Sequence, residues 1–298
     1  MTTAEDFQRE RPYLVRLAYR MLGSVADAED VVQQSFLRWL SAGCPALDSP
    51  RAWFTRTCVR LCLDRLKSAR HEREQYVGEW LPEPILDREE RGPEVDETLS
   101  MALLLTIQRL RPAERAAFLL HDVFDYEFKE VAEILDLEPA YCRQLAVRAR
   151  RHLEGEAVRS EEDAETVHRL SKTFFEALAS GDLGALQSLL AEGVVLRADG
   201  GGRVAAARRP LFGRPKVLRF LEGVFVKPRP RPRLELRASW FNGAPGFLVC
   251  DDGRPVSAFH FRILDGLIQD IFIQRNPEKL QVFEAVEASE ERRMGPSP

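Results

Sequence analysis

The chain has 298 residues, 45% of them hydrophobic, which is enough to bury more than one core and corresponds to about two domains. Its net charge of −4 and isoelectric point near 5.9 do not by themselves indicate a nucleic-acid-binding protein. The first residues are too charged for a signal peptide, and no apolar run reaches the roughly 18–20 residues that span a bilayer. We therefore expect a cytoplasmic protein with no membrane association.

The five cysteines are an odd number and lie mostly in apolar helical settings, a pattern typical of a reducing compartment. Cys58 and Cys62 share one helix face, where two thiolates can contribute to a metal site. Because no histidine or third cysteine lies at ligand spacing nearby, buried packing is favoured. We expect neither a metal nor a cofactor.

Residues 1–75 have the periodicity of a helical domain. Its first helix ends at Gly23, the second covers about Val25–Leu40, and the third runs from Pro50 to about His71. The expected core positions are Leu14, Leu17, Ala18, Met21, Leu22, Val31, Val32, Phe36, Trp39, Leu40, Trp53, Phe54, Thr57, Leu61 and Leu66.

Residues 76–97 differ in composition from the helices on either side. They hold three prolines and two glycines, show little periodicity, and carry an acidic run from Glu83 to Glu97. This composition indicates an acidic linker.

Residues 98–155 contain helical patterns at about Leu99–Leu110 and Ala113–His121, and then a segment, Phe128–Leu153, that predicts two short helices and a tight turn. Asp136 is expected at the turn because Asp tolerates left-handed geometry, and Pro139 suits the first turn of the second helix. The inward set is Cys142, Leu145, Ala146 and Ala149, and the outward set is Arg143, Gln144, Arg148, Arg150, Arg151 and His152.

An outward face without acids on the second helix fits a helix-turn-helix that places cations against DNA phosphates and base edges. The residues expected to reach DNA are Tyr141, Arg143, Gln144, Arg148 and Arg151. A helical hairpin with a solvated basic face is the alternative.

After a second linker at 156–163, residues 164–285 predict an α+β domain with a curved antiparallel sheet. The expected helices are Val167–Ala179, Leu183–Leu190 and Pro215–Val226, and the expected strands are Gly193–Ala198, Arg203–Arg208, Leu234–Phe241, Gly246–Cys250, Pro255–Ile263 and Leu267–Gln274. Residues 286–298 are expected to be a disordered tail.

Three segments resemble the conserved regions of bacterial extracytoplasmic-function (ECF) sigma factors: RLAYRMLGSVADAEDVVQQSFLRW, PRAWFTRTCVRLCLDRLKSAR and IQRLRPAERAAFLL. The resemblance covers about the first 155 residues. It implies two all-α domains that bind core RNA polymerase, at its beta-prime clamp and beta flap, and read the minus-10 and minus-35 promoter elements. The helix-turn-helix residues would then read the minus-35 element.

Three further segments, WLPEP, DGGGRV and NPEKL, resemble the signatures of the subgroup that carries a C-terminal SnoaL-like domain. Members commonly show NPDKL, so Glu278 is a mild departure. This likeness extends to nearly the whole chain. It implies that the C-terminal domain tunes sigma activity within the same polypeptide.

Two further surfaces follow from the residues together with this resemblance. Along residues 50–71 the basic set Arg51, Arg56, Arg60, Arg65, Lys67 and Arg70 is expected to bind the minus-10 strand, with Trp53 and Phe54 either core residues or the wall of a pocket for a flipped base. On residues 27–38 the polar set Asp27, Asp30, Gln33 and Gln34 is expected to contact polymerase.

The linker segment WLPEP has a plausible partner in the C-terminal domain, where docking would set the spacing of the two DNA-binding domains. The expected regulatory set is Trp80, Leu81, Pro82, Asp199, Gly200, Gly201, Gly202, Asn276, Pro277 and Lys279. A tight turn that needs positive φ is an equally good explanation of the glycines.

The C-terminal domain offers Asp199, Asp251 and His260 as acid/base candidates, but no convincing pair among them, so we do not expect an enzyme. A small apolar ligand in its pocket is possible. The rival interpretations are a ligand-sensing one-component DNA-binding regulator that does not act as sigma, and a cyclase or isomerase fused to a DNA-binding module.

Overall fold

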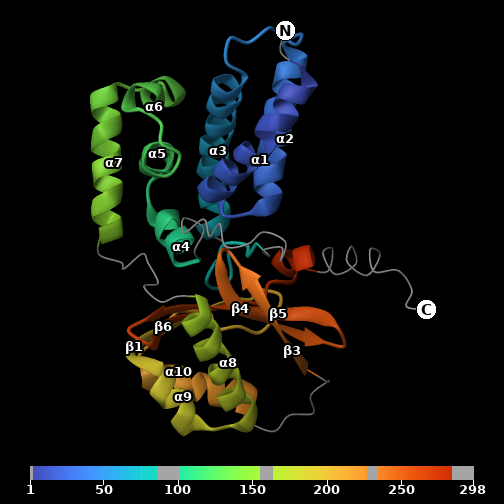
Figure 1. Ribbon diagram of the computed structural model, residues 1–298, viewed down its shortest axis with the longest axis vertical. Coiled ribbons are helices and arrows are strands. Elements are labelled where there is room, and N and C mark those ends of the chain that lie inside the picture. The colour runs from blue at the N-terminus through green and yellow to red at the C-terminus, as the bar shows by residue number, and fades with distance from the viewer. Residues whose placement is uncertain (1–2, 75, 86–100, 155–163, 227–233, 284–298) are drawn as a thin grey trace, which may run out of the picture. The chain divides into compact units, whose positions relative to one another are not determined.

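The computed structural model describes residues 3–74, 76–85, 101–154, 164–226 and 234–283. Its contacts divide the chain into two compact units, and Figure 1 shows their elements. The first unit holds Met1–Gln75 with Leu103–Val158, and the second holds Tyr76–Ala102 with Arg159–Pro298. The described part of the expected linker, residues 76–85, therefore belongs with the C-terminal domain. The expected tail and the most acidic part of the linker lie outside the described residues.

The first unit begins with three helices, α1 (Ala4–Leu22), α2 (Val25–Ser41) and α3 (Pro50–Glu74). Gly23 separates the first two with φ of 74°, a left-handed conformation that glycine adopts without steric cost. The side chain of Ser24 then caps α2 by accepting from the Asp27 amide.

Four expected core positions of this bundle are more exposed than predicted. Leu40 is 42% exposed, and Phe36, Trp53 and Thr57 are half-buried, whereas Phe54 is fully buried. At the edge of an apolar stripe, periodicity alone does not decide between core and surface.

The rest of the first unit consists of α4 (Met101–Arg109), α5 (Pro112–Phe118), a π-helical turn (Leu119–Val123), α6 (Phe128–Leu135) and α7 (Pro139–Glu154). The turn between α6 and α7 is the predicted one, because Asp136 caps α6 with φ of 60°. The helix-turn-helix geometry is therefore present as expected.

Buried polar contacts join the two parts of this unit. Arg115 of α5 is buried and donates to the carbonyl of Met21 at the end of α1, and also to the carbonyl of Gln108 at 2.8 Å. The hydroxyls of Tyr13 and Tyr126 are 2.8 Å apart, and burial together with this contact raises the pKa of Tyr13. These contacts satisfy groups that would be costly to bury alone.

The second unit contains α8 (Ala164–Ser180), α9 (Leu183–Leu189) and α10 (Arg214–Leu221), followed by a π-helical turn (Glu222–Val226). Its strands are β1 (Leu190–Asp199), β2 (Leu211–Phe212), β3 (Leu234–Phe241), β4 (Ala244–Asp251), β5 (Arg254–Leu264) and β6 (Leu267–Gln274), in the sheet order β2-β1-β6-β5-β4-β3. The three helices cover one face of this sheet (Figure 1). The expected class, all-α domains followed by an α+β domain, is confirmed.

Two details of the sheet differ from the prediction. The sheet is mixed, because β1 pairs with β6 in parallel. No strand forms at Arg203–Arg208, which is irregular, and the described strand nearest to it is β2. This segment follows a glycine turn, and its two arginines, Arg203 and Arg208, are exposed, so it offers little to pack against the sheet.

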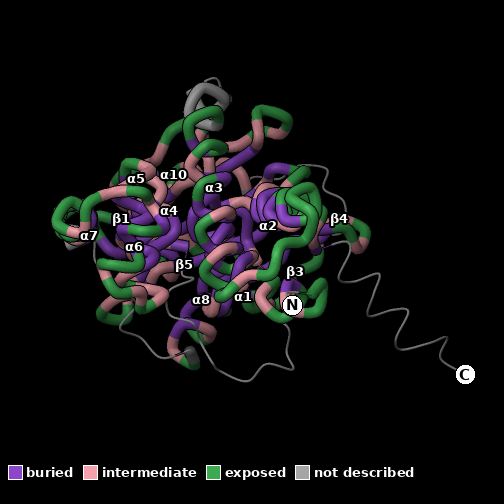
Figure 2. Tube along the Cα trace, turned by 90° about the horizontal axis from the view of Figure 1, so that it is seen from above, coloured by how far each residue is buried: buried purple, intermediate pink, exposed green. Residues whose placement is uncertain are grey.

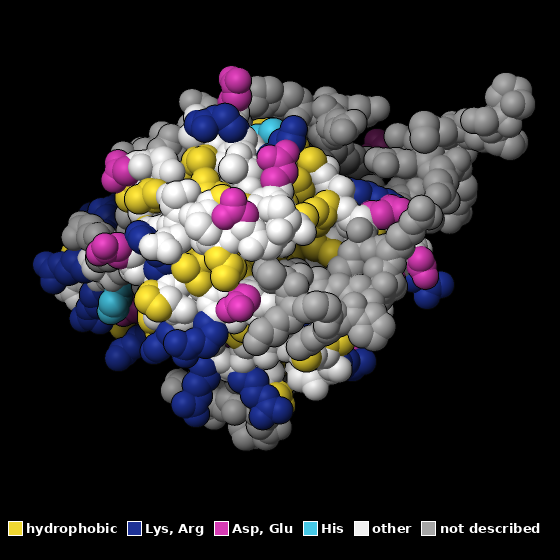
Figure 3. Space-filling model, turned by 90° about the horizontal axis from the view of Figure 1, so that it is seen from below, with side chains coloured by type: hydrophobic (Ala, Val, Ile, Leu, Met, Phe, Trp, Pro, Cys, Tyr) yellow, Lys and Arg dark blue, Asp and Glu magenta, His cyan; other side chains and the backbone are white. Residues whose placement is uncertain are grey.

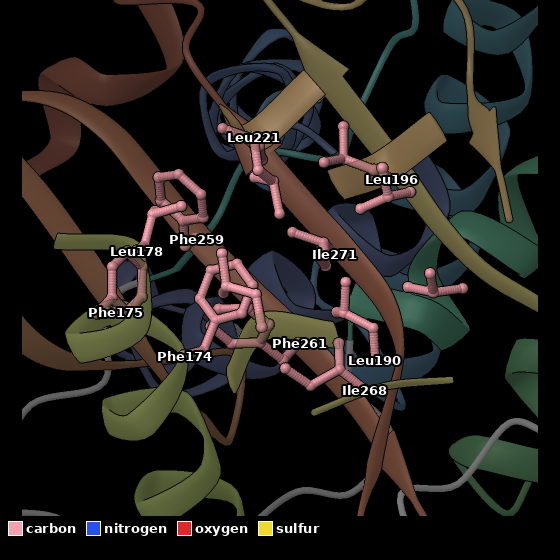
Figure 4. Close-up of a cluster of buried hydrophobic side chains, with 14 of the residues drawn as sticks. Phe174, Phe175, Leu178, Leu190, Leu196, Leu221, Phe259, Phe261, Ile268 and Ile271 are labelled. Atoms are coloured by element: carbon pink, nitrogen blue, oxygen red, sulfur yellow. The ribbon is translucent and has the colours of Figure 1, made fainter. Parts of the chain in front are cut away.

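The concave face of the sheet is filled by side chains. Phe174 and Phe175 of α8 meet Phe259 and Phe261 of β5, with ring centroids 5.1 Å apart for both Phe174–Phe261 and Phe175–Phe259 (Figure 4). Leu221 of α10 joins the same cluster. Figure 2 colours the chain by burial and shows buried segments inside and exposed segments outside.

A smaller cluster lies on the other face of the sheet. It consists of Phe241, Leu248, Cys250, Ala258, Leu280 and Phe283, with the last two contributed by the helical residues 277–283. This second cluster explains why the segment NPEKL lies against the sheet.

Candidate DNA, polymerase and linker-binding surfaces

The outer face of α7 is the first candidate surface. All the residues expected to reach DNA are exposed: Tyr141, Arg143, Gln144, Arg148 and Arg151. The opposite side of the helix is buried through Cys142, Leu145, Ala146 and Ala149. Because the buried stripe fixes the rotation of α7, the cations are held outward, as insertion into a DNA groove requires.

Two contacts refine the prediction for this face. Arg150 is half-buried and pairs with Asp122 at 2.6 Å, so it braces α7 against the π-helical turn and does not join the outward set. The Arg143 guanidinium lies 5.9 Å from the centroid of the Phe128 ring, at the start of α6.

The second surface is a hollow of about 450 Å³ between α2 and α3, lined by Arg38, Trp53, Arg56, Thr57 and Arg60. The Trp53 ring packs edge-on against the ring of the buried Phe54, with the ring centroids 5.1 Å apart, and this contact orients the Trp53 ring. A fixed aromatic wall surrounded by three cations suits an unstacked base and its phosphates. Sequence reasoning missed Arg38 as a member of this surface because it lies on the preceding helix.

The remaining expected minus-10 residues are distributed differently. Arg51 lies over the Tyr13 ring at 4.2 Å, and Arg65 pairs with Asp27. Lys67 pairs with Asp64 at 3.3 Å. The side chain of Arg70 lies outside the described residues. The structure thus brings Arg56 and Arg60 together with Trp53, and places the other described members of the set elsewhere along α3.

The third surface is the exposed side of α2. Asp30, Gln33 and Gln34 are exposed there, whereas Asp27 is half-buried and paired with Arg65. Leu37 is 50% exposed, one turn beyond the two glutamines. An exposed apolar side chain within a polar surface fits the apolar centre and polar rim of a protein interface. Its place one helical turn after Gln33 was the available sequence signal.

The fourth surface binds the linker, and its centre is the fully buried carboxylate of Asp199 at the end of β1. One oxygen accepts from the Tyr76 hydroxyl at 2.6 Å and the other from the Leu81 amide at 3.0 Å. Lys279 donates to the second oxygen at 2.7 Å and lies over the Trp80 ring at 4.2 Å. Burial, and then the bond to Asp199, raises the pKa of Tyr76, so its hydroxyl remains a donor.

Amide side chains extend this linker contact along residues 76–85. Asn276 donates to the Tyr76 hydroxyl at 3.1 Å, and Gln274 donates to the Pro82 carbonyl at 3.4 Å. Asn242 pairs twice with the Ile85 backbone, at 3.0 Å each way. We call Asp199, Lys279, Asn276 and Asn242 the linker latch. It brings together the expected regulatory residues of the linker and of the C-terminal domain, and Pro277 opens the helical residues 277–283 beside it.

The glycines after Asp199 serve both the turn and the contact. Gly201 and Gly202 have φ of 63° and 70°. A Cβ atom on Gly201 would lie 2.5 Å from the Asn276 side chain, and one on Gly202 would lie 3.0 Å from Val77 of the linker. Gly200 is also closely packed, because a Cβ there would lie 2.4 Å from the Val204 carbonyl oxygen.

The acid/base candidates do not form a catalytic group in the described structure. His260 is buried beside the Phe241 ring, its Nε2 has no partner among the described residues, and burial lowers its pKa to about 3. Asp199 is engaged by the linker. His260 therefore stays neutral near pH 7 within an apolar cluster.

The described residues hold no group of three His, Cys, Asp or Glu side chains placed to bind a metal ion. Cys58 and Cys62 are both buried, and burial raises the pKa of Cys62, which opposes the thiolate that a metal requires. Among the described helices, none is long and apolar enough to cross a membrane.

These surfaces define a DNA-binding protein with a helix-turn-helix domain, a second basic helical domain and an appended α+β domain. Residues 7–72 match the model of Sigma-70 region 2, and residues 100–153 match that of Sigma-70, region 4. Over 231 residues the chain is 41% identical to the ECF RNA polymerase sigma factor SigJ of Mycobacterium tuberculosis, which covers 76% of this chain and 74% of that protein.

A second relative is the probable ECF RNA polymerase sigma factor SigI of Mycobacterium tuberculosis, 37% identical over 72% of this chain and 75% of that protein. The crystal structure of SigJ superposes with a TM-score of 0.74 and 32% identity, over 94% of this chain and 99% of that chain. The chain belongs to the family of extracytoplasmic-function RNA polymerase sigma factors.

Proposed function

We propose that this sigma factor reads the minus-35 element with the outer face of α7. The support is the exposed set on that helix, which has the length and placement of a recognition helix. Gln144 and Arg148 are exposed one helical turn apart, which suits them to base edges in the major groove. Replacing either by Ala is expected to weaken promoter binding and relax the preference at one base position.

The hollow between α2 and α3 is the proposed site for a minus-10 base that leaves the duplex. Trp53 supplies the ring, and Arg56 and Arg60 supply the charge for the flanking phosphates. Sequence preference at one position would come from the shape of this hollow, because the arginine contacts to phosphates carry no sequence information.

Core polymerase is proposed to bind the exposed side of α2 through Asp30, Gln33, Gln34 and the apolar centre at Leu37. A polar rim around an exposed apolar side chain is the arrangement expected of a specific interface. The beta-prime clamp is the proposed subunit for this surface, and the beta flap for the helix-turn-helix domain.

The C-terminal domain is proposed to restrain the sigma domains by holding the linker. The observation that carries this is the buried Asp199 carboxylate, which is satisfied by linker groups and Lys279. Docking fixes the ten residues 76–85, which when extended would span about 35 Å. Docking holds these residues at one fixed span, so a docked linker limits how far the two DNA-binding domains can separate.

The packing inside the first unit shows why a limit on the separation of the two DNA-binding domains matters. Arg60 of α3 lies 3.5 Å from Asp136 at the helix-turn-helix turn, so a residue proposed for the minus-10 site contacts the minus-35 domain. While this contact holds, the two domains keep one fixed separation, which limits the promoter spacing that they can read. Release of the linker is therefore expected to raise promoter-specific transcription.

The test is in vitro transcription with bacterial core RNA polymerase over a fragmented genomic library. The unmodified chain is expected to yield transcripts that start downstream of one shared two-part motif. Lys279→Met, which removes the charge that completes the latch, should increase those transcripts several-fold. Glu278→Gln is the matched control, because it breaks only the exposed pair with Arg203 in the same helical segment.

Unchanged or fewer transcripts from Lys279→Met would contradict restraint by the linker. We do not propose a small apolar ligand, because aromatic and aliphatic side chains fill the concave face. Nor do we propose catalysis, because Nε2 of the buried His260 has no hydrogen-bond partner among the described residues.

A further inference from the structure

A third basic region lies in the C-terminal domain, apart from the two basic helices of the first unit. Residues 203–219 contain six Lys or Arg residues and no Asp or Glu, in a chain whose net charge is −4. Arg203 pairs with Glu278 at 2.5 Å, so it is not available. The others are Arg208, Arg209, Arg214, Lys216 and Arg219, which we call the α10 patch.

The fold presents this charge to solvent. Val217 and Leu221 of α10 are buried in the core, which turns Lys216 and Arg219 outward. Arg208 and Arg209 are exposed in the segment before β2, and Arg214 is half-buried. Viewed from the side of the three helices, the surface shows a group of Lys and Arg side chains (Figure 3).

The members of the α10 patch form no ion pair with any residue that the structure describes. Elsewhere in the domain, cations have such partners: Arg197 and Arg262 both bind Asp270, at 2.7 Å and 2.5 Å. Like charges placed together repel each other, and a polyanion that binds them relieves this repulsion. The patch thus has the chemistry of a phosphate-binding surface.

We propose that the α10 patch contacts the phosphate backbone of duplex DNA without regard to sequence. Guanidinium groups suit phosphate because they present paired donors. A bilayer is less favoured, because a membrane-binding helix keeps an apolar face for insertion, whereas Val217 and Leu221 of α10 face inward and the exposed Phe212 lies outside that helix. This inference goes beyond the proposed function, since it adds a DNA contact outside the sigma domains.

The experiment measures binding of the full chain to a 30-base-pair duplex without promoter motifs, by fluorescence anisotropy over a range of KCl concentrations. The variant is Arg209→Gln/Lys216→Gln/Arg219→Gln. The matched control, Arg169→Gln/Lys172→Gln/Arg254→Gln, removes the same charge from exposed positions of the same domain.

Each phosphate neutralised contributes about 0.9 to the slope of log K against log salt concentration. The patch variant is expected to lower that slope by about 2 to 3 and weaken binding at low salt at least tenfold, with the control close to the unmodified chain. An unchanged slope, or an equal fall in the control, would overturn the proposal. So would loss of binding to vesicles of phosphatidylglycerol with an unchanged DNA slope, because that result assigns the patch to a lipid surface. Polymerase is absent, so none of these results bears on sigma activity.

Discussion

Substitution of Asp199 by Asn should release the linker without unfolding the domain. The carboxylate has no exposed surface, and the substitution removes the negative charge that lies 2.7 Å from the mostly buried Lys279 ammonium. Breaking a buried pair by changing one partner costs about 3–5 kcal/mol. Because 1.4 kcal/mol is tenfold in an equilibrium constant, the open form of the linker should become about a hundredfold or more easier to reach.

Hydrogen exchange of the Ile85 amide is the assay. That amide donates to Asn242 at 3.0 Å, and neither group contacts Asp199, so its protection reports docking at a distance from the substitution. Exchange at Ile85 should accelerate by about two orders of magnitude, since local opening sets the exchange rate. Amides in β5 and β6 should stay protected, and Glu278→Gln should change neither.

Two results would refute this reasoning. Unchanged exchange at Ile85 would mean that the linker stays docked without the Asp199 charge. Equal acceleration across β5 and β6 would mean that Asp199 stabilises the domain fold and does not hold the linker in particular.

Three further predictions follow from single side chains. His260 has a lowered pKa in the folded chain, so between about pH 6.5 and 3 the unfolded state binds more protons and the free energy of unfolding falls as the pH drops. From pH 7 to 5 this loss of stability is about 2 kcal/mol. His260→Leu should flatten this pH dependence in urea unfolding curves. Leu37→Glu should weaken binding to core polymerase at least tenfold in a fluorescence titration. Its melting temperature should not change, because Leu37 is half exposed. Binding as tight as that of the unmodified chain would show that α2 is not part of the interface. Arg115→Met should leave the Met21 and Gln108 carbonyls without their donor and cost about 2–4 kcal/mol, seen as faster proteolysis within the helical unit. Arg16→Met, at an exposed position of α1, should be nearly neutral.

Local rules predicted the helix-turn-helix because its signals lie close together in the chain. The tolerance of Asp136 for positive φ, the position of Pro139 and the 3.6-residue stripe on α7 all act within a few residues. The strands β3 and β6 were predicted with their observed bounds for the same reason.

Other features depended on residues far apart in sequence. The parallel pairing of β1 with β6 joins segments separated by the whole domain, and no local pattern specifies it. The hollow at Trp53 needs Arg38 from another helix. Asp199 was singled out from its motif, but its burial and the identity of its linker partners are set by tertiary packing.

The linker latch also has a consequence for the chain while it is being made. The described linker segment ends at Ile85, whereas Lys279, which completes the charge balance around Asp199, lies 194 residues further along. At typical rates of synthesis these residues take roughly 10–40 s to translate. Once α7 has been made, both helical domains are present while the latch still lacks Lys279, so the complete restraint belongs to the finished molecule and not to the growing one.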